Sequence, residues 1–164
     1  MVVEKRPGAA GERASECLGQ AVRYLSYRPR SESELRGLLA KRGFPSDEID
    51  ETVLRLKEKG LLNDFRFARL WKGSRLSLRP RSQRMIRLEL EEKGISQEII
   101  DETTADIDDE DLAYGLALKR IQKSPQDEKW KIHLYNFLKR RGFNHETITQ
   151  TIRKITTKGR EIWE

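Results

Sequence analysis

The sequence predicts an all-α protein made of tandem three-helix modules. The first observation is an internal repeat of about 50 residues, in which a leucine, a basic turn, a glycine and an apolar residue recur around Gly43, Gly94 and Gly142. The second is that serine or asparagine caps and glycine stops recur at the expected helix ends. The third is the near absence of strand signals, since clean period-2 runs and Asn-Gly or Asp-Gly hairpins are missing. Repeat architectures usually act as binding surfaces, so the pattern favours a binding protein.

The repeat divides the 164 residues into five segments. We expect a disordered N-terminal tail over 1–14 and a C-terminal tail over 159–164. Three three-helix repeats lie between them, the first at 15–62, the second at 63–108 and the third at 109–158. Only 36% of the residues are hydrophobic and 37% are charged, which suits a thin core shared between neighbouring modules.

The first helix of the first module is expected to begin at Ser15, which is a good N-cap, and to run to about Tyr27. Leu18, Val22 and Leu25 then share one face of that helix, as the 3.6-residue period requires. The arginine-proline-arginine sequence that follows ends the helix, because proline disfavours helical backbone at the residue before it.

The other two helices of this module are marked by caps at both ends. Ser31 and Glu34 form a capping box that begins the second helix. That helix ends at Gly43, where a left-handed residue is wanted. Ser46 begins the third helix, which ends at Gly60.

The second and third modules repeat this plan. We expect a helix from Asn63 to about Arg75, a second from Ser82 to Gly94, and a third that carries Ile107 inward. In the third module a break at 124–125 separates the first two helices, the second helix ends at Gly142, and Asn144 caps the last one.

The formal charge of +6 hides a strong segregation of charge along the chain. The stretch 65–88 holds eight basic residues and no acidic one: Arg66, Arg69, Lys72, Arg75, Arg79, Arg81, Arg84 and Arg87. The stretch 96–111 holds eight acidic residues and no basic one: Glu98, Asp101, Glu102, Asp106, Asp108, Asp109, Glu110 and Asp111. A phosphate backbone or an acidic protein groove is the natural partner of the basic stretch. The alternative for each single charge is a solvated helix face, and for Lys139, Arg140 and Arg141 it is interaction with the helix dipole.

Signals for chemistry are absent. The sequence contains no phosphate-binding loop, dinucleotide fingerprint, zinc-protease motif or calcium loop, so we expect no cofactor, no metal and no enzymatic activity. His133 and His145 have no partner residues at catalytic spacing, and Cys17 is expected to be a buried thiol. No apolar span of membrane length and no signal peptide is present, so we expect a cytoplasmic protein without a membrane partner.

Sequence-specific reading of the DNA major groove is the alternative that a helix-turn-helix pattern raises. The charges oppose it. The third helix of the first module begins with Asp47, Glu48 and Asp50, which phosphates would repel. No arginine or asparagine stands there for bidentate base contacts.

The residues around the first module boundary resemble the RecX family of recombinase regulators. The strongest match is Gly60-Leu61-Leu62-Asn63-Asp64-Phe65-Arg66-Phe67-Ala68, in which asparagine replaces the aspartate usual at position 63. The turns that end at Gly43, Gly94 and Gly142 support it in register, and the resemblance covers residues 17 to 156. The loop at 78–81 departs from the family pattern but keeps a basic charge through Arg79 and Arg81.

The resemblance implies an elongated crescent of three helix-turn-helix-like modules that binds the bacterial recombinase RecA, chiefly as its filament on single-stranded DNA. It implies a protein that modulates, and mostly inhibits, the RecA ATPase, filament growth and strand exchange in recombination, DNA repair and the SOS response. We expect the free protein to be a monomer. Single-stranded DNA would be bound as part of the filament or weakly by itself. A general basic nucleic-acid-binding protein and a helical scaffold for some other protein are the alternatives.

Two sets of residues follow from the resemblance together with the charges. The family signature is expected to serve the fold and the module joint, through Gly60, Leu61, Asp64, Arg66, Phe67 and Ala68. The surface that contacts RecA or DNA is expected to consist of Arg75, Arg79, Arg81, Arg84, Arg87, Lys139, Arg140 and Arg141.

Overall fold

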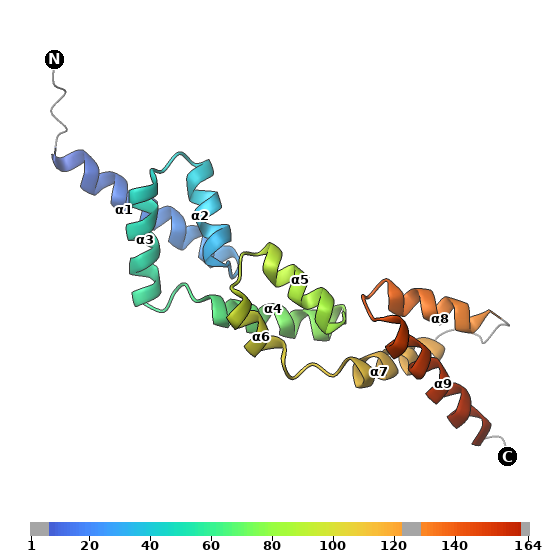
Figure 1. The fold of residues 1–164 in the computed structure, drawn as a ribbon. Helices are drawn as coiled ribbons and strands as arrows, with labels where there is room; N and C mark the ends of the chain where they lie inside the picture. The colour runs from blue at the N-terminus through green and yellow to red at the C-terminus, as the bar shows by residue number, and fades with distance from the viewer. Residues whose placement is uncertain (1–6, 123–128, 162–164) are drawn as a thin grey trace. The chain divides into compact units, whose positions relative to one another are not determined.

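The computed structural model describes the backbone of residues 7–122 and 129–161, and the side chains of 11–122 and 129–157. These residues form helices and no strand, which confirms the all-α prediction (Figure 1). The helices in chain order are α1 (Pro7–Tyr27), α2 (Glu32–Lys41), α3 (Ser46–Glu58), α4 (Asp64–Leu78), α5 (Gln83–Glu92), α6 (Gln97–Thr104), α7 (Asp109–Gln122), α8 (Trp130–Lys139) and α9 (His145–Glu161).

The helices belong to two compact units. Unit 1 contains the described residues up to Leu70 together with Leu90–Ile99, and unit 2 contains Trp71–Glu89 together with the described residues from Ile100 onward. The first module therefore lies in unit 1 and the third in unit 2, while the middle module contributes to both. The module boundaries at 62 and 108 stay predictions, as does the crescent.

The core of unit 1 lies where α1, α2 and α3 pack on one another. Its buried side chains are Cys17, Ala21, Leu35, Leu39, Ile49, Val53, Leu56 and Leu62. The predicted inward face of α1 was wrong at Val22, which is 45% exposed. Cys17 and Ala21 are buried instead, because small side chains one turn apart let α1 approach the core closely.

The ends of the chain differ from the prediction. α1 begins at Pro7 rather than at Ser15, so part of the predicted tail 1–14 is helical. Proline is tolerated there because the first helical N–H groups have no partner in any case. α9 continues to Glu161, into the predicted tail 159–164. Residues 1–6, the predicted break at 124–125 and residues 162–164 lie outside the described part of the chain.

The predicted ends of α2 are confirmed. Ser31 Oγ accepts the backbone N–H of Glu34 at 3.1 Å, while the Glu34 carboxylate accepts the N–H of Ser31 at 3.4 Å. At the other end Gly43 has a φ of 87°, and the N–H of Phe44 donates to the carbonyl of Leu39 at 3.3 Å. These bonds satisfy backbone groups that helix ends leave without partners.

The third helix of the middle module is shorter than predicted. α6 ends at Thr104, so Ile107 lies in the following connection and not on the helix. Asp108 accounts for this, since its Oδ1 accepts the N–H groups of Glu110 at 2.9 Å and Asp111 at 3.0 Å. An N-cap for α7 at this position requires non-helical backbone just before it.

The glycine turn at 93–94 docks on the start of α2, within unit 1. The Ser31 hydroxyl donates to the carbonyl of Lys93 at 2.6 Å, and Ser31 is fully buried. A Cβ atom on Gly94 would collide with Cβ of Ser33, whereas a Cβ on Gly43 would meet nothing within 4 Å. Gly94 therefore serves a close approach as well as a turn.

The turn at 141–142 docks in the same way on the start of α5, within unit 2. The N–H of Ser82 donates to the carbonyl of Arg141 at 2.9 Å. A Cβ on Gly142 would lie 2.7 Å from Oγ of Ser82 and would collide with the side chain of Met85. The residues before the two glycines thus bond equivalent serines of the preceding module, Lys93 through Ser31 and Arg141 through Ser82.

A second bond strengthens each contact. Oδ1 of Asp64, the first residue of α4, accepts the N–H of Glu32 at 2.8 Å, and Oδ1 of Asp109, the first residue of α7, accepts the N–H of Gln83 at 2.8 Å. We call the set at Ser31, Glu32, Asp64 and Gly94 the first joint, and the set at Ser82, Gln83, Asp109 and Gly142 the second joint. Burial raises the pKa of both aspartates.

Replacing Gly94 by alanine should destabilise the protein more than replacing Gly43. Both variants place a side chain on left-handed backbone, which costs about 1 kcal/mol. Gly94→Ala also forces Ser33 aside, so its total loss should reach about 2–4 kcal/mol. Urea unfolding followed by circular dichroism gives both free energies, and equal losses would contradict the close approach at the first joint.

Asp64→Asn should be at least as stable as the parent protein at pH 7. Burial holds the folded pKa of Asp64 above its unfolded value, so the ionised carboxylate lowers the free energy of unfolding at neutral pH, and this loss disappears as the pH falls through the folded pKa to below the unfolded one. Asparagine keeps an acceptor oxygen without the charge, so its advantage should shrink towards low pH.

Asp64→Ala is the matched control for the cap itself. It removes the acceptor for the N–H of Glu32 and should cost about 1 kcal/mol. The free energies of unfolding of the parent protein, Asp64→Asn and Asp64→Ala are measured between pH 3 and pH 7. If Asp64→Asn becomes less stable relative to the parent as the pH rises, burial does not raise the pKa of Asp64.

Candidate anion-binding surface

The eight residues predicted to contact a partner all lie in unit 2, and the structure brings their two segments together. The second joint places the end of α8 beside the start of α5. Besides the Ser82 to Arg141 backbone bond, Nη1 of Arg141 donates to the carbonyl of Pro80 at 3.2 Å. Bases at 79–87 and 139–141 therefore share one surface, although they are more than 50 residues apart in the sequence.

Four guanidinium groups influence one another there, and we call Arg81, Arg120, Arg140 and Arg141 the arginine cluster. Burial lowers the pKa of Arg141, and the positive charges of Arg81, Arg140 and Arg120 lower it further. Phe137 holds two of the four, since the guanidinium carbons of Arg141 and Arg120 lie 4.3 Å and 5.4 Å from its ring centre. Like charges held this close attract an anion.

Little negative charge compensates the cluster. Among the described residues its one ion pair joins Arg81 to Glu89 at 3.2 Å. Nε of Arg141 is buried and has no hydrogen-bond partner in the described part of the chain. A buried donor without a partner is costly, so a bound anion that accepts from this group would be favoured.

Two of the predicted contact residues are engaged inside the unit. Oε2 of Glu89 accepts Nε of Arg75 at 2.5 Å and the indole N–H of Trp71 at 2.8 Å, and the Arg75 guanidinium carbon lies 4.3 Å from the Trp71 ring centre. Arg87 pairs with the carboxylate of Asp101. These contacts tie α5 to α4 and to α6, so Arg75 and Arg87 hold the module together.

Four of the predicted residues remain accessible. Arg79, Arg84, Lys139 and Arg140 are exposed. Arg79, Arg84 and Arg140 form no ion pair with the described residues, and Lys139 lies over the ring of Tyr135 at 6.0 Å. Together with the arginine cluster, these four form the candidate anion-binding surface. Their role as contact residues stays a prediction.

Several charges that are segregated along the sequence form ion pairs in the folded protein. Besides the pair of Arg87 with Asp101, Lys72 contacts Asp106 at 2.8 Å. Asp108 and Asp109 are used as helix caps, and Glu110 pairs with Lys154 at 3.2 Å. Most of the acidic stretch thus has partners within unit 2, so the run of acidic residues in the sequence does not give a separate acidic patch at these positions.

The family-signature residues lie at the start of α4 in unit 1. Gly60 has a φ of 65° after α3, Asp64 belongs to the first joint, and Phe67 and Ala68 are buried. Leu61 and Arg66 instead face a pocket. Arg120 was not among the residues predicted to contact a partner. The only sequence feature that hints at the cluster is the aromatic residue Phe137, one turn before Arg141.

The described residues show neither a metal cluster nor a membrane-spanning helix. They contain no group of three or more His, Cys, Asp or Glu that could hold a metal ion. In the same part of the chain no helix is long and apolar enough to cross a membrane. Cys17 is buried as predicted, and burial raises its pKa, which makes the thiol less reactive.

The fold and this surface define a class of protein: a helical protein of tandem three-helix modules that presents a basic surface. Comparison with known proteins identifies the family. Residues 17–56 match the family model described as the first three-helix domain of RecX, and residues 63–103 match the second.

Curated relatives match over most of the chain. The regulatory protein RecX of Prosthecochloris aestuarii is 33% identical over 144 residues, which are 87% of this chain and 95% of that protein. That of Chlorobium phaeobacteroides is 37% identical over 136 residues, which are 82% and 90% of the two chains. The crystal structure of RecX from Lactobacillus salivarius has the same fold, with a TM-score of 0.75 at 22% identity over 90% of this chain and 99% of that one. The chain belongs to the RecX family of regulatory proteins.

Removing the Glu89 carboxylate should destabilise unit 2. Glu89→Ala leaves the half-buried Trp71 N–H and two guanidinium groups without their acceptor, at a cost of about 2 kcal/mol. Glu92→Ala on the same helix is exposed and should change stability by less than about 0.5 kcal/mol. Thermal unfolding of both variants measures the difference, and similar melting temperatures would show that Glu89 does not organise this surface.

Proposed function

We propose that this protein binds RecA and its filament on single-stranded DNA and modulates it, mostly by inhibiting ATP hydrolysis, filament growth and strand exchange. Membership of the RecX family carries this proposal, since its curated relatives are named regulatory proteins. The protein acts in recombination and DNA repair by binding and not by catalysis.

The candidate anion-binding surface supports the proposal. A nucleoprotein filament presents phosphates and acidic protein surface together, and both are complementary to closely spaced arginines. Arginine suits this role better than lysine because its planar guanidinium makes paired hydrogen bonds to phosphate or carboxylate oxygens. The partner would first contact the exposed side chains of Arg79, Arg84, Lys139 and Arg140. The half-buried arginines would strengthen the positive electrostatic potential of the surface.

General binding of nucleic acid is the second candidate function, because the arginine cluster does not by itself distinguish a phosphate on free DNA from one in a filament. The two functions differ in what limits binding. Free DNA would be bound through released counterions, so the affinity would fall steeply with salt. Binding to the filament also includes protein contacts. It should therefore persist at salt concentrations that abolish binding to free DNA.

Charge reversal of Arg84 and Arg140 should weaken inhibition of the RecA ATPase on single-stranded DNA. Both side chains are exposed, so the double variant R84E/R140E should fold normally. We expect the half-inhibitory concentration to rise about tenfold, as loss of strong interface contacts does. ATP hydrolysis by RecA, measured against added protein, gives this value.

R23E/K59E is the matched control, since it removes the same charge from exposed positions of unit 1. It should shift the half-inhibitory concentration by less than about threefold, because net charge alone acts weakly at ordinary ionic strength. An effect of equal size in both variants would locate the contact elsewhere. If the parent protein leaves RecA unaffected but binds an oligonucleotide with a steep salt dependence, the second candidate function is correct.

A further inference from the structure

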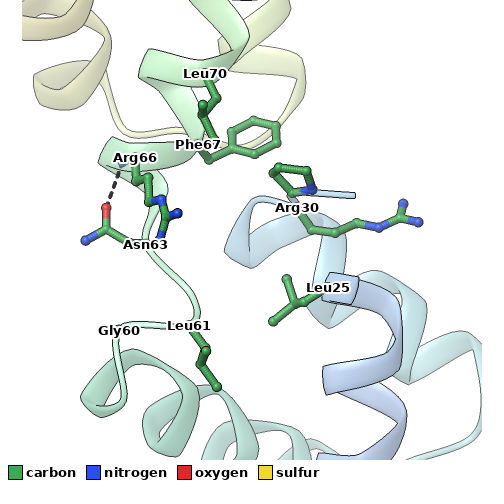
Figure 2. A pocket seen from close by; sticks show the side chains of 9 residues that line it. Leu25, Arg30, Gly60, Leu61, Asn63, Arg66, Phe67 and Leu70 are labelled. Carbon is green, nitrogen blue, oxygen red and sulfur yellow. Dashed lines mark hydrogen bonds between the residues drawn. The ribbon is translucent and has the colours of Figure 1, made fainter. Parts of the chain in front are cut away.

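A pocket of about 160 Å³ opens in unit 1 between the end of α1 and the start of α4. Figure 2 shows Leu25, Leu61 and Phe67 around it, with Arg66 on one side and Arg30 on the other. The lining residues are Leu25, Pro29, Arg30, Gly60, Leu61, Asn63, Arg66, Phe67 and Leu70. We call it the α1–α4 pocket.

The apolar part of this pocket is partly exposed to solvent. Leu61 is 56% exposed and Leu70 is 51% exposed, while Phe67 behind them is only 4% exposed. Exposed leucines beside a buried aromatic side chain gain free energy when a partner's apolar group covers them. The volume matches one large side chain, since a cavity of about 150 Å³ holds a benzene ring.

The polar part of the pocket is positively charged. Arg30 and Arg66 line it, and none of its nine lining residues is acidic. Neither arginine forms an ion pair with a carboxylate of the described residues, and Nε of Arg30 is buried without a hydrogen-bond partner there. The pocket therefore combines a solvent-exposed apolar wall with two guanidinium groups that lack counter-charges.

The local backbone holds this arrangement in place. Asn63 Oδ1 accepts the N–H of Arg66 at 2.8 Å, which caps α4 and fixes the residue at the pocket edge (Figure 2). The glycine at position 60 turns the chain so that Leu61 comes next to the opening. A preformed site of this kind needs little reordering on binding.

We propose that the α1–α4 pocket anchors an acidic peptide segment of a protein partner. An apolar side chain of the segment enters between Leu25, Leu61 and Phe67, and carboxylates on either side of it pair with Arg30 and Arg66. A bare phosphate would leave the apolar wall uncovered, and an uncharged apolar segment would leave both arginines unpaired. The mixed chemistry selects a segment that carries both groups.

This inference deepens the proposed function, because it gives the regulator a protein anchor in addition to the anion-binding surface. It rests on that function only for the identity of the partner. The chemistry of the segment follows from unit 1 alone, so the two can be tested separately.

The probe is a seven-residue peptide of sequence Ser-Gly-Glu-Phe-Glu-Gly-Ser, titrated into the full-length ¹⁵N-labelled protein. We expect the backbone amides of Leu61, Arg66 and Leu70 to shift with saturation. A peptide with lysines in place of both glutamates, and one with alanine in place of phenylalanine, should each bind at least about tenfold more weakly.

Variants of α4 test the assignment with controls on the same helix. Arg66→Glu should weaken binding of the acidic peptide about tenfold, whereas Arg69→Glu, exposed but outside the pocket, should change it by less than about twofold. Leu70→Ser should weaken binding severalfold, and Leu78→Ser, which is 79% exposed, should not.

Asn63→Asp is the most conservative variant. An aspartate still accepts the N–H of Arg66 and caps α4, so the fold is kept. Its carboxylate competes for the arginines of the pocket and should weaken the acidic peptide about threefold or more.

The outcomes separate this inference from the proposed function. Equal binding of the acidic and the lysine peptide, or equal binding to the parent protein and Arg66→Glu, would overturn the acidic-peptide assignment even if RecA inhibition is intact. Shifts of the same amides with an oligonucleotide and not with the peptide would show a phosphate site, and concentration-dependent shifts without any probe would show a second copy in the pocket. Either result would overturn the inference. A peptide that binds as expected to a protein without effect on RecA supports the pocket and refutes the proposed function.

Discussion

The contact between a glycine turn and the first turn of the preceding second helix is the constraint on which this structure depends. It needs a residue without Cβ at positions 94 and 142, a serine to meet it, and an aspartate from the next first helix to cap the backbone beside it. Because Ser31 and Ser82 are fully buried, losing the partner of either serine leaves a buried polar group unsatisfied. Thin modules with few apolar residues are stabilised in this way.

The basic surface is a product of the second joint. Arg141 follows α8, and the carbonyl of this same residue accepts the N–H of Ser82, so the turn that docks the last module also delivers its arginines to the start of α5. Phe137 then supports two guanidinium groups that come from different helices. The turn after α8 therefore serves both the packing of the last module and the charge of the candidate anion-binding surface. That surface depends on the hydrogen bonds of the second joint.

The sequence predicted what is determined locally. The capping box of α2 and the turn at Gly43 need only a few neighbouring residues, and these were confirmed. The inward face of α1 was wrong at Val22 alone, since Leu18 and Leu25 pack against the core as predicted. Cys17 and Ala21 are buried in place of Val22, because small side chains there let the helix approach the core closely. Pairing of Arg87 with Asp101, or of Lys72 with Asp106, depends on packing between helices. Arg120 joined the cluster for the same reason. A run of like charges in the sequence thus did not fix which charges remain unpaired.

In each joint a glycine turn contacts a serine at the start of the second helix of the preceding module. The last module has no serine at the equivalent position. Trp130 stands twelve residues before Gly142, in the register of Ser31 before Gly43 and Ser82 before Gly94. An indole at the start of α8 has neither the small size nor the hydroxyl that the other two seats provide. The turn at Gly43 has free space around it. The start of α8 in a second molecule cannot form a joint contact with this turn, because it lacks the serine. Head-to-tail contacts that do not close lead to fibres, and this replacement removes the matching half of such a contact. The repeat therefore does not offer, at its last module, the surface through which such a contact would continue from one molecule to the next.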